Sequence, residues 1–287
     1  MHSKLIEEDQ AVRDVPKDVF CYARPDLWKP QIWSIFDDVL DQGVIDEFLQ
    51  YPPEEFDEDL FWLDEIVLET KNRFISMKKL AGERLAHQYR ALRAAHGTRT
   101  SNIESFYRSG LHRLCSDEMD QIASDLLVRP DHPSTTQKLL NDAICEVNAK
   151  GTGGRDGFLY LCTDERELID RAGHYLIYGS EYLYNLAIRA MDTWSAQRFL
   201  KSIGIPTMIV CDIPFADIPT YQQEYFATKC IERMFCDLLG QSISFGHSPA
   251  IILQQDLLPE HIVGHYHPSL ISDPFNRHFP YNFEASS

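Results

Sequence analysis

The stretch FLYLCTDERELIDRA, residues 158–172, carries a strand signal followed at once by a helix signal. FLYLCTD is apolar and aromatic, which predicts a strand whose Tyr160 and Cys162 side chains face the same side. ERELIDRA then predicts a short helix. Similar strand predictions fall at residues 206–214, 249–255 and 261–267, with helical segments between them. Strands and helices are mixed here without a regular β-α alternation. This pattern predicts an α+β fold for this part of the chain.

The first hundred residues have a different pattern, which predicts helices. Residues 29–49 carry apolar side chains at helical spacing, and a second apolar stripe with steps of three and four residues runs from Leu60 to Leu92. Basic residues lie along the same element: Lys71, Arg73, Lys78, Lys79, Arg84, Arg90 and Arg93. Such a row of charges is typical of a solvated helix face, and it also suits a docking surface for an acidic partner.

A boundary is predicted where this helical pattern stops. HGTRTSN, residues 96–102, combines a glycine with small polar residues and interrupts the apolar stripe. We therefore expect two parts, a helical N-terminal region over residues 1–97 and a second domain over residues 98–287.

The composition of the 287 residues is that of a globular protein, with 44 % apolar and 25 % charged residues. The net charge of −17 argues against a mainly electrostatic DNA-binding surface, which requires clustered Lys and Arg. No apolar run reaches the roughly 18 residues of a membrane-spanning helix, and the charged N-terminal residues lack the apolar core of a secretion signal. Seven cysteines without a CxxC pair are typical of free thiols in a reducing compartment, so we expect a cytoplasmic protein that does not bind membranes.

GHYLIYGSEYL, residues 173–183, contains many polar groups for a segment that otherwise has a buried pattern. Each buried hydroxyl needs a hydrogen-bond partner, so a core segment ordinarily contains few of them. Two interpretations follow. The segment enters a core helix with satisfied hydroxyls, or it lines a ligand cleft with Tyr178 and Ser180 facing the ligand.

Two further segments supply groups suited to ligand binding. SFYRSGL predicts a short strand that ends at Arg108, whose guanidinium forms a planar fork that binds phosphate. Gly110 leaves room for a ligand beside the backbone. YQQEYF supplies the carboxylate of Glu224. The residues from Thr220 to Gln223 have the pattern of a capping box, which places Glu224 in the first turn of a helix.

The order of these segments resembles the ADP-ribosyltransferase superfamily, whose members bind NAD in a cleft of a split, mixed sheet. Tyr107 and Arg108 are similar to the first motif of the family, an aromatic–Arg pair at a strand end. The sequence Gln222-Gln223-Glu224 is similar to the third motif, which supplies a glutamate. The resemblance covers residues 103–268.

The second motif, which shapes the nicotinamide pocket, has two matches. One is the strand that contains Tyr160, and the other is the segment that contains Tyr178 and Ser180. The glutamate also has alternatives. Glu181 is one of them, and Glu260 is another, because the closing segment LLPEHIVGHYHP resembles the last strand of some members.

The resemblance implies a transferase that uses NAD as a substrate and moves ADP-ribose to a macromolecular acceptor, either protein, RNA or DNA. Under this hypothesis Glu224 is the catalytic residue, no metal is required, and NAD contacts Tyr107, Arg108, Gly110, Tyr160, Tyr178 and Ser180. The resemblance is to bacterial toxins and defence effectors, which implies a neutralising protein partner.

Two other functions are open on the sequence alone. The first is a non-enzymatic interaction protein that docks partners through its N-terminal helices and their basic residues. The second is a metal-dependent hydrolase that uses the closely spaced His261, His265 and His267, since imidazole is a common ligand of zinc.

Overall fold

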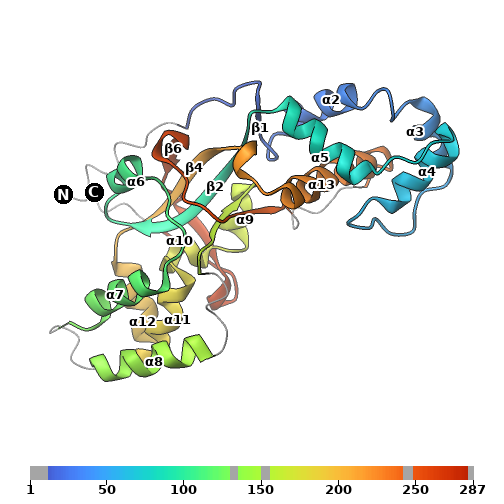
Figure 1. The fold of residues 1–287 in the computed structure, drawn as a ribbon. Helices are drawn as coiled ribbons and strands as arrows, with labels where there is room; N and C mark the ends of the chain where they lie inside the picture. The colour runs from blue at the N-terminus through green and yellow to red at the C-terminus, as the bar shows by residue number, and fades with distance from the viewer. Residues whose placement is uncertain (1–11, 130–134, 150–155, 242–247, 284–287) are drawn as a thin grey trace.

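Two ten-residue strands, β2 (Ala91–Thr100) and β4 (Ile205–Pro214), pair antiparallel over their whole length at the centre of the protein (Figure 1). The strands β3 (Leu159–Cys162) and β5 (Ala250–Leu253) continue the sheet on one side, and β6 (Ile262–Tyr266) continues it on the other. This computed structural model describes residues 12–129, 135–149, 156–241 and 248–283.

Both faces of this sheet are covered. Successive residues of a strand point to opposite faces. On β4, Ile209, Cys211 and Ile213 therefore belong to a first core, whereas Met208 and Val210 belong to a second. Burial on both faces explains why this strand is a nearly continuous apolar run in the sequence.

The first core is formed with helices from distant parts of the chain. These are α2 (Pro25–Ile35), α3 (Gln42–Gln50), α4 (Phe61–Lys71), α5 (Met77–Gln88) and α13 (Thr220–Leu238), on the right of Figure 1. The short strand β1 (Val19–Phe20) runs parallel to the start of β2 and brings Phe20 into the same core. The Phe20 ring packs edge to face on Phe226 of α13, at a centroid distance of 5.0 Å.

The second core packs the opposite face of the sheet on another group of helices. These are α7 (Ser116–Leu127), α8 (Gln137–Ala149), α9 (Glu165–Asp170), α10 (His174–Tyr178), α11 (Glu181–Ala190) and α12 (Thr193–Ser202). A hairpin of β7 (Leu270–Asp273) and β8 (Phe279–Asn282), joined through a 3-10 turn at Pro274–Asn276, packs beside α10. Within the described ranges, no helix combines the length and the apolar character that a bilayer crossing requires.

The predicted α+β composition is confirmed, and so are four of the five strands predicted in the second part of the chain, which are β3, β4, β5 and β6. The segment HPSLISDPFNRHFPYNFEASS, residues 267–287, is irregular in its sequence pattern, so no strand is predicted there, but it contains the β7–β8 hairpin. Each strand of this hairpin has only four residues, and prolines lie before, between and within them. Such short, proline-flanked strands give little periodic signal.

The prediction of one helical element from Leu60 to Leu92 is also wrong. Asn72 ends α4 in the left-handed conformation, with φ of 52°. The buried Asp64 carboxylate of α4 then accepts a hydrogen bond from the Met77 backbone N–H at 2.7 Å, which holds the start of α5. The last part of the stripe belongs to β2, so the boundary predicted after residue 97 falls within the central strand.

Candidate functional site

Tyr107 and Arg108 lie on a short helix, α6 (Glu104–Ser109), so the strand predicted for SFYRSGL is wrong. A helix forms because Glu104 complements its first turn and Gly110 ends it with a positive φ. This helix follows β2 and packs on the first core through Tyr107, while the Arg108 side chain is exposed.

Gly110 permits a close contact within the chain. Its φ is 81°, and a Cβ at this position would lie 2.0 Å from the carbonyl oxygen of Leu257. The backbones of Leu111 and Leu257 exchange two hydrogen bonds, of 2.9 Å and 2.8 Å. The room that we predicted for a ligand is therefore occupied by the segment that leads to Glu260.

That segment places Glu260 and His265 beside α6. Glu260 lies in a 3-10 turn, η3 (Pro259–His261), which packs against α6 and directly precedes β6. On β6, the buried His265 has its Nδ1 2.8 Å from the Tyr107 hydroxyl. Burial raises the pKa of Tyr107 to about 12, so this phenol stays protonated at neutral pH. The first predicted motif and the closing segment thus meet in space.

Glu224 lies away from this arrangement. It is in α13, which begins at Thr220 without a side-chain cap, so the helical position predicted for Glu224 is correct but the capping box does not form. The residue packs directly on α5, where a Cβ added to Gly82 would lie 2.9 Å from its Cγ. Its place is therefore a contact between two helices.

Glu181 is on the opposite side of the sheet from Glu224. It is the first residue of α11, and its carboxylate accepts a hydrogen bond from the Tyr175 hydroxyl at 3.0 Å. Of the three glutamates considered from the sequence, Glu260 is the one that lies beside α6.

The hydroxyls of Tyr178 and Ser180 have hydrogen-bond partners on the side of the sheet that carries the second core. Tyr178 is only 2 % exposed, and its hydroxyl donates to Oδ2 of Asp273 at 2.6 Å. The Ser180 hydroxyl oxygen caps α11 by accepting from the Leu183 backbone N–H at 3.5 Å. These contacts match the interpretation of GHYLIYGSEYL as a core helix entry with satisfied hydroxyls, and they do not support its interpretation as a cleft wall.

His96 is a residue that the sequence reasoning used only as part of a boundary. The strand pairing sets it opposite Ile209 of β4, which is in turn opposite His265 of β6. Directly opposed residues share a face, so both imidazoles lie on the first-core face. Nδ1 of His96 lies 3.1 Å from the Tyr160 carbonyl oxygen, whereas the Tyr160 side chain is exposed. In the sequence, the only local sign of this residue's position was a histidine among the small residues of AAHG, residues 94–97.

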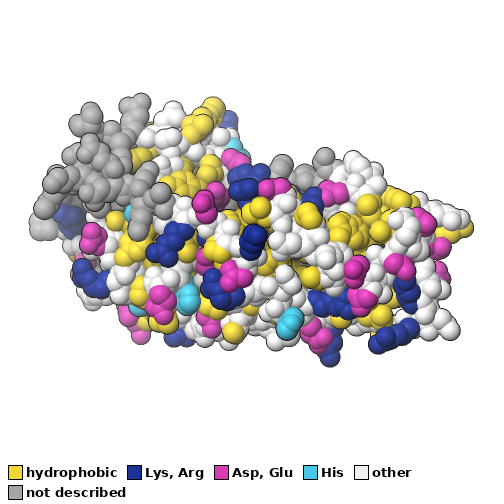
Figure 2. All heavy atoms as spheres, turned by 90° about the horizontal axis from the view of Figure 1, so that it is seen from above, with side chains coloured by type: hydrophobic (Ala, Val, Ile, Leu, Met, Phe, Trp, Pro, Cys, Tyr) yellow, Lys and Arg dark blue, Asp and Glu magenta, His cyan; other side chains and the backbone are white. Residues whose placement is uncertain are grey.

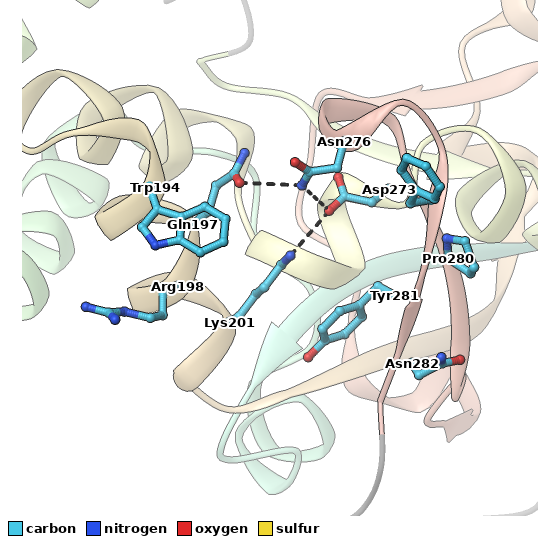
Figure 3. Close-up of a pocket in the computed structure, with 10 residues that line it drawn as sticks. Trp194, Gln197, Arg198, Lys201, Asp273, Asn276, Pro280, Tyr281 and Asn282 are labelled. Carbon is cyan, nitrogen blue, oxygen red and sulfur yellow. Dashed lines mark hydrogen bonds and ion pairs between the residues drawn. The ribbon is translucent and has the colours of Figure 1, made fainter.

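A pocket of about 380 Å³ lies elsewhere, between α12 and the β7–β8 hairpin (Figure 3). It is lined by Trp194, Gln197, Arg198, Lys201, Asp273, Asn276, Phe279, Pro280, Tyr281 and Asn282. Tyr178 is not a lining residue, but its hydroxyl is hydrogen-bonded to Asp273, which is one. The residues predicted to bind NAD are not part of this lining.

The histidines predicted as metal ligands make other contacts. Nδ1 of His265 faces Tyr107, and Nδ1 of His267 lies 2.9 Å from the Pro206 carbonyl oxygen. In the part of the chain that the structure describes, no three His, Cys, Asp or Glu side chains are grouped to hold a metal ion. This geometry gives the metal-hydrolase hypothesis no support.

The basic residues predicted as a docking surface are largely held by acids of the same chain. The pairs are Lys71–Asp41, Lys78–Asp59, Lys79–Glu83, Arg84–Asp38, Arg90–Asp18 and Arg93–Asp212. The last of these is buried within the sheet. Figure 2 shows Lys and Arg side chains interspersed with Asp and Glu rather than gathered in one area. The row of charges is thus mainly an internal network.

Two places combine groups suited to chemistry or binding, the α6–η3–β6 region and the pocket beside α12. In the first, the Glu260 carboxylate, the Arg108 guanidinium and the His265 imidazole come from three separate elements. Comparisons of the chain with protein-family models, with curated proteins and with solved structures gave no match.

Proposed function

We propose that this chain is an NAD-dependent ADP-ribosyltransferase in which Glu260, rather than Glu224, is the catalytic carboxylate. The observation that carries the proposal is the packing of η3 against α6, which sets Glu260 near Tyr107 and Arg108. These residues belong to the first motif and the closing segment of the sequence resemblance. They are far apart in the chain, so their meeting is a property of the fold.

A carboxylate at this place suits the reaction. Cleavage of the bond between ribose and nicotinamide develops positive charge on the sugar, and a nearby carboxylate stabilises that charge and accepts the proton of the attacking group. Glu260 is exposed, and its carboxylate has no hydrogen bond or ion pair within the described residues. By contrast, Glu181 is bonded to Tyr175 and Glu224 is packed on a neighbouring helix.

The surrounding side chains suit the other parts of the substrate NAD. The exposed guanidinium of Arg108 can bind the pyrophosphate in two places. Tyr107 offers a ring whose hydroxyl is already fixed by His265. His96 lies on the same face of the sheet but two strands away from His265, and burial lowers its pKa.

The sheet is in keeping with an ADP-ribosyltransferase-like domain. β1 and β3 both pair with β2, while β4 pairs with it over its whole length, so two separate strands share one edge of β2. One of them is parallel and the other antiparallel. We include in the proposal a macromolecular acceptor, either protein or nucleic acid, and the role of a toxin or defence effector restrained by a protein partner.

The test is incubation of the purified chain with NAD labelled in its adenylate part, with and without a cell lysate. We expect free nicotinamide and label on a macromolecule. Glu260→Gln keeps the size of the side chain, and we expect it to lower nicotinamide release at least about a hundredfold, the scale of a lost catalytic group.

Glu224→Gln and Glu181→Gln are matched controls, and both should retain activity within a few-fold of the unmodified chain. The proposal fails if the unmodified chain releases no nicotinamide with any lysate. The assignment of Glu260 fails if Glu260→Gln stays active while a control is inactive. Label found only as free ADP-ribose indicates a hydrolase that uses the same carboxylate.

A further inference from the structure

The pocket between α12 and the β7–β8 hairpin has the shape and walls of a small-molecule site. Its volume of about 380 Å³ is within the usual range of ligand pockets. Trp194, Gln197, Arg198 and Lys201 are spaced as neighbours on one helix face, so they form one continuous wall. Figure 3 shows Trp194 and Tyr281 on opposite sides of Lys201.

Lys201 is a fixed cation within this pocket. Its Nζ lies 3.4 Å from the Asp273 carboxylate and 5.1 Å and 5.2 Å from the ring centres of Tyr178 and Tyr281. The side chain nevertheless keeps 29 % of its surface exposed. A charged group that is held in place before binding loses little conformational freedom when a ligand arrives.

The Asp273 carboxylate is already satisfied. It accepts hydrogen bonds from the Tyr178 hydroxyl at 2.6 Å, from Nδ2 of Asn276 at 2.7 Å and from the Phe275 backbone N–H at 3.1 Å. Its side chain is only 3 % exposed, and Lys201 balances its charge. Asp273 therefore orders the pocket floor and is not open to a cationic ligand.

Arg198 adds a positive charge to the pocket. It is exposed, and no acid pairs with it in the described parts of the chain. Trp194 is 72 % exposed and Phe279 is 68 % exposed, so the same pocket presents aromatic faces to solvent. Exposed apolar side chains that gather in one patch beside polar groups mark binding surfaces, unlike those scattered singly.

We propose that this pocket binds a free mononucleotide, with its base stacked on Trp194 and its phosphate on Arg198 and Lys201. Aromatic rings stack on any base, and Arg binds phosphate through two parallel hydrogen bonds. A neutral sugar would leave the Arg198 charge unused, and an inorganic anion would leave the exposed rings unused. A ring that carries a phosphate uses both kinds of group. The site shares no residue with the proposed catalytic region, so this inference does not depend on the transferase proposal.

The test is titration of the full chain with AMP, followed by tryptophan fluorescence and by calorimetry. We expect saturable binding, with adenosine and inorganic phosphate each binding at least about tenfold more weakly. Arg198→Ala should weaken AMP binding about tenfold or more, because it removes a charge-assisted contact. Trp194→Ala should weaken binding and remove most of the fluorescence change.

Arg73→Ala is the matched control, because Arg73 is also exposed but lies in the loop between α4 and α5. Glu260→Gln should also bind AMP as the unmodified chain does. The proposal is overturned if AMP binding does not saturate, if Arg198→Ala binds as tightly as the Arg73 control, or if Glu260→Gln loses AMP binding. Much tighter binding of a short single-stranded oligonucleotide than of AMP would also overturn it, in favour of a nucleic-acid site.

Discussion

The imidazole of His96 is held in its neutral form by its place in the sheet. Burial lowers its pKa, while a contact with the Tyr160 carbonyl oxygen acts in the opposite sense. In an unfolded chain a histidine titrates near pH 6.5. Since the folded pKa is depressed, protons bind the unfolded state preferentially as the pH falls below about 6.5. The stabilisation present above that pH is therefore lost as the pH falls toward the folded value.

We expect the free energy of unfolding to decrease from about pH 7.5 to about pH 5.5, and to decrease less in His96→Asn. Urea titrations at the two pH values measure this difference. His87→Asn is the matched control, because it removes an imidazole that is exposed on α5. Equal slopes for His96→Asn and the unmodified chain would contradict the assignment of this pH dependence to His96.

The Tyr178 hydroxyl links α10 to the β7–β8 hairpin. It donates to the buried Asp273 carboxylate at 2.6 Å, and burial together with that carboxylate raises the pKa of Tyr178. Tyr178→Phe leaves the carboxylate with one donor fewer, so we expect a loss of about 1–3 kcal/mol in the free energy of unfolding. Denaturant titration measures it. Tyr175→Phe, which removes a hydroxyl bonded to the less buried Glu181, should cost less.

At the scale of elements, the contact between α5 and α13 depends on the absence of a side chain at Gly82. A Cβ there would lie 3.1 Å from the Cα and 3.2 Å from the backbone nitrogen of Glu224. Gly82→Val must therefore separate the two helices, and we expect a loss of about 1–3 kcal/mol, typical of overpacking. Glu83→Val, at the exposed neighbouring position, controls for the helix propensity of valine. A loss no larger than that of the control would show that the helices yield easily.

Elements with a strong local signal were predictable. The runs that became β3, β4, β5 and β6 are apolar and bounded by polar residues or turns, and α13 has clear helical spacing. Elements that depend on contacts with distant parts of the sequence were not predictable. β2 continues an apolar stripe with helical spacing, and only its pairing with β4 makes it a strand. In α6, six residues are too few to show a period.

At the scale of the whole molecule, the candidate site was only partly predictable for the same reason. Tyr107, Arg108 and Glu260 were all considered from the sequence, but nothing local distinguished Glu260 from Glu224. The distinction comes from the packing of η3 on α6. The pocket beside α12 gave no signal, because six of its ten lining residues come from the hairpin that the sequence did not predict.

The distribution of charge over the whole chain gives the last prediction. The net charge is −17, and the basic residues of the N-terminal helices are used to join these helices to the loops around them. Arg84 of α5 forms ion-paired hydrogen bonds with Asp38, and Lys78 of the same helix pairs with Asp59. Exposed pairs of this kind contribute up to about 1 kcal/mol each.

Replacing Lys78 and Arg84 by Glu turns two attractions into repulsions in a chain that already repels itself. We expect the double variant to lose about 1–3 kcal/mol in the free energy of unfolding, and to regain part of it at about 0.5 M salt, where exposed charges are screened. Arg73→Glu, which breaks no ion pair among the residues that the structure describes, should change stability little. The docking hypothesis for these helices predicts the reverse, an unchanged free energy of unfolding with loss of partner capture in a pull-down. Denaturant titrations at low and high salt, run beside the pull-down, separate a network that holds the helices together from a surface kept for a partner.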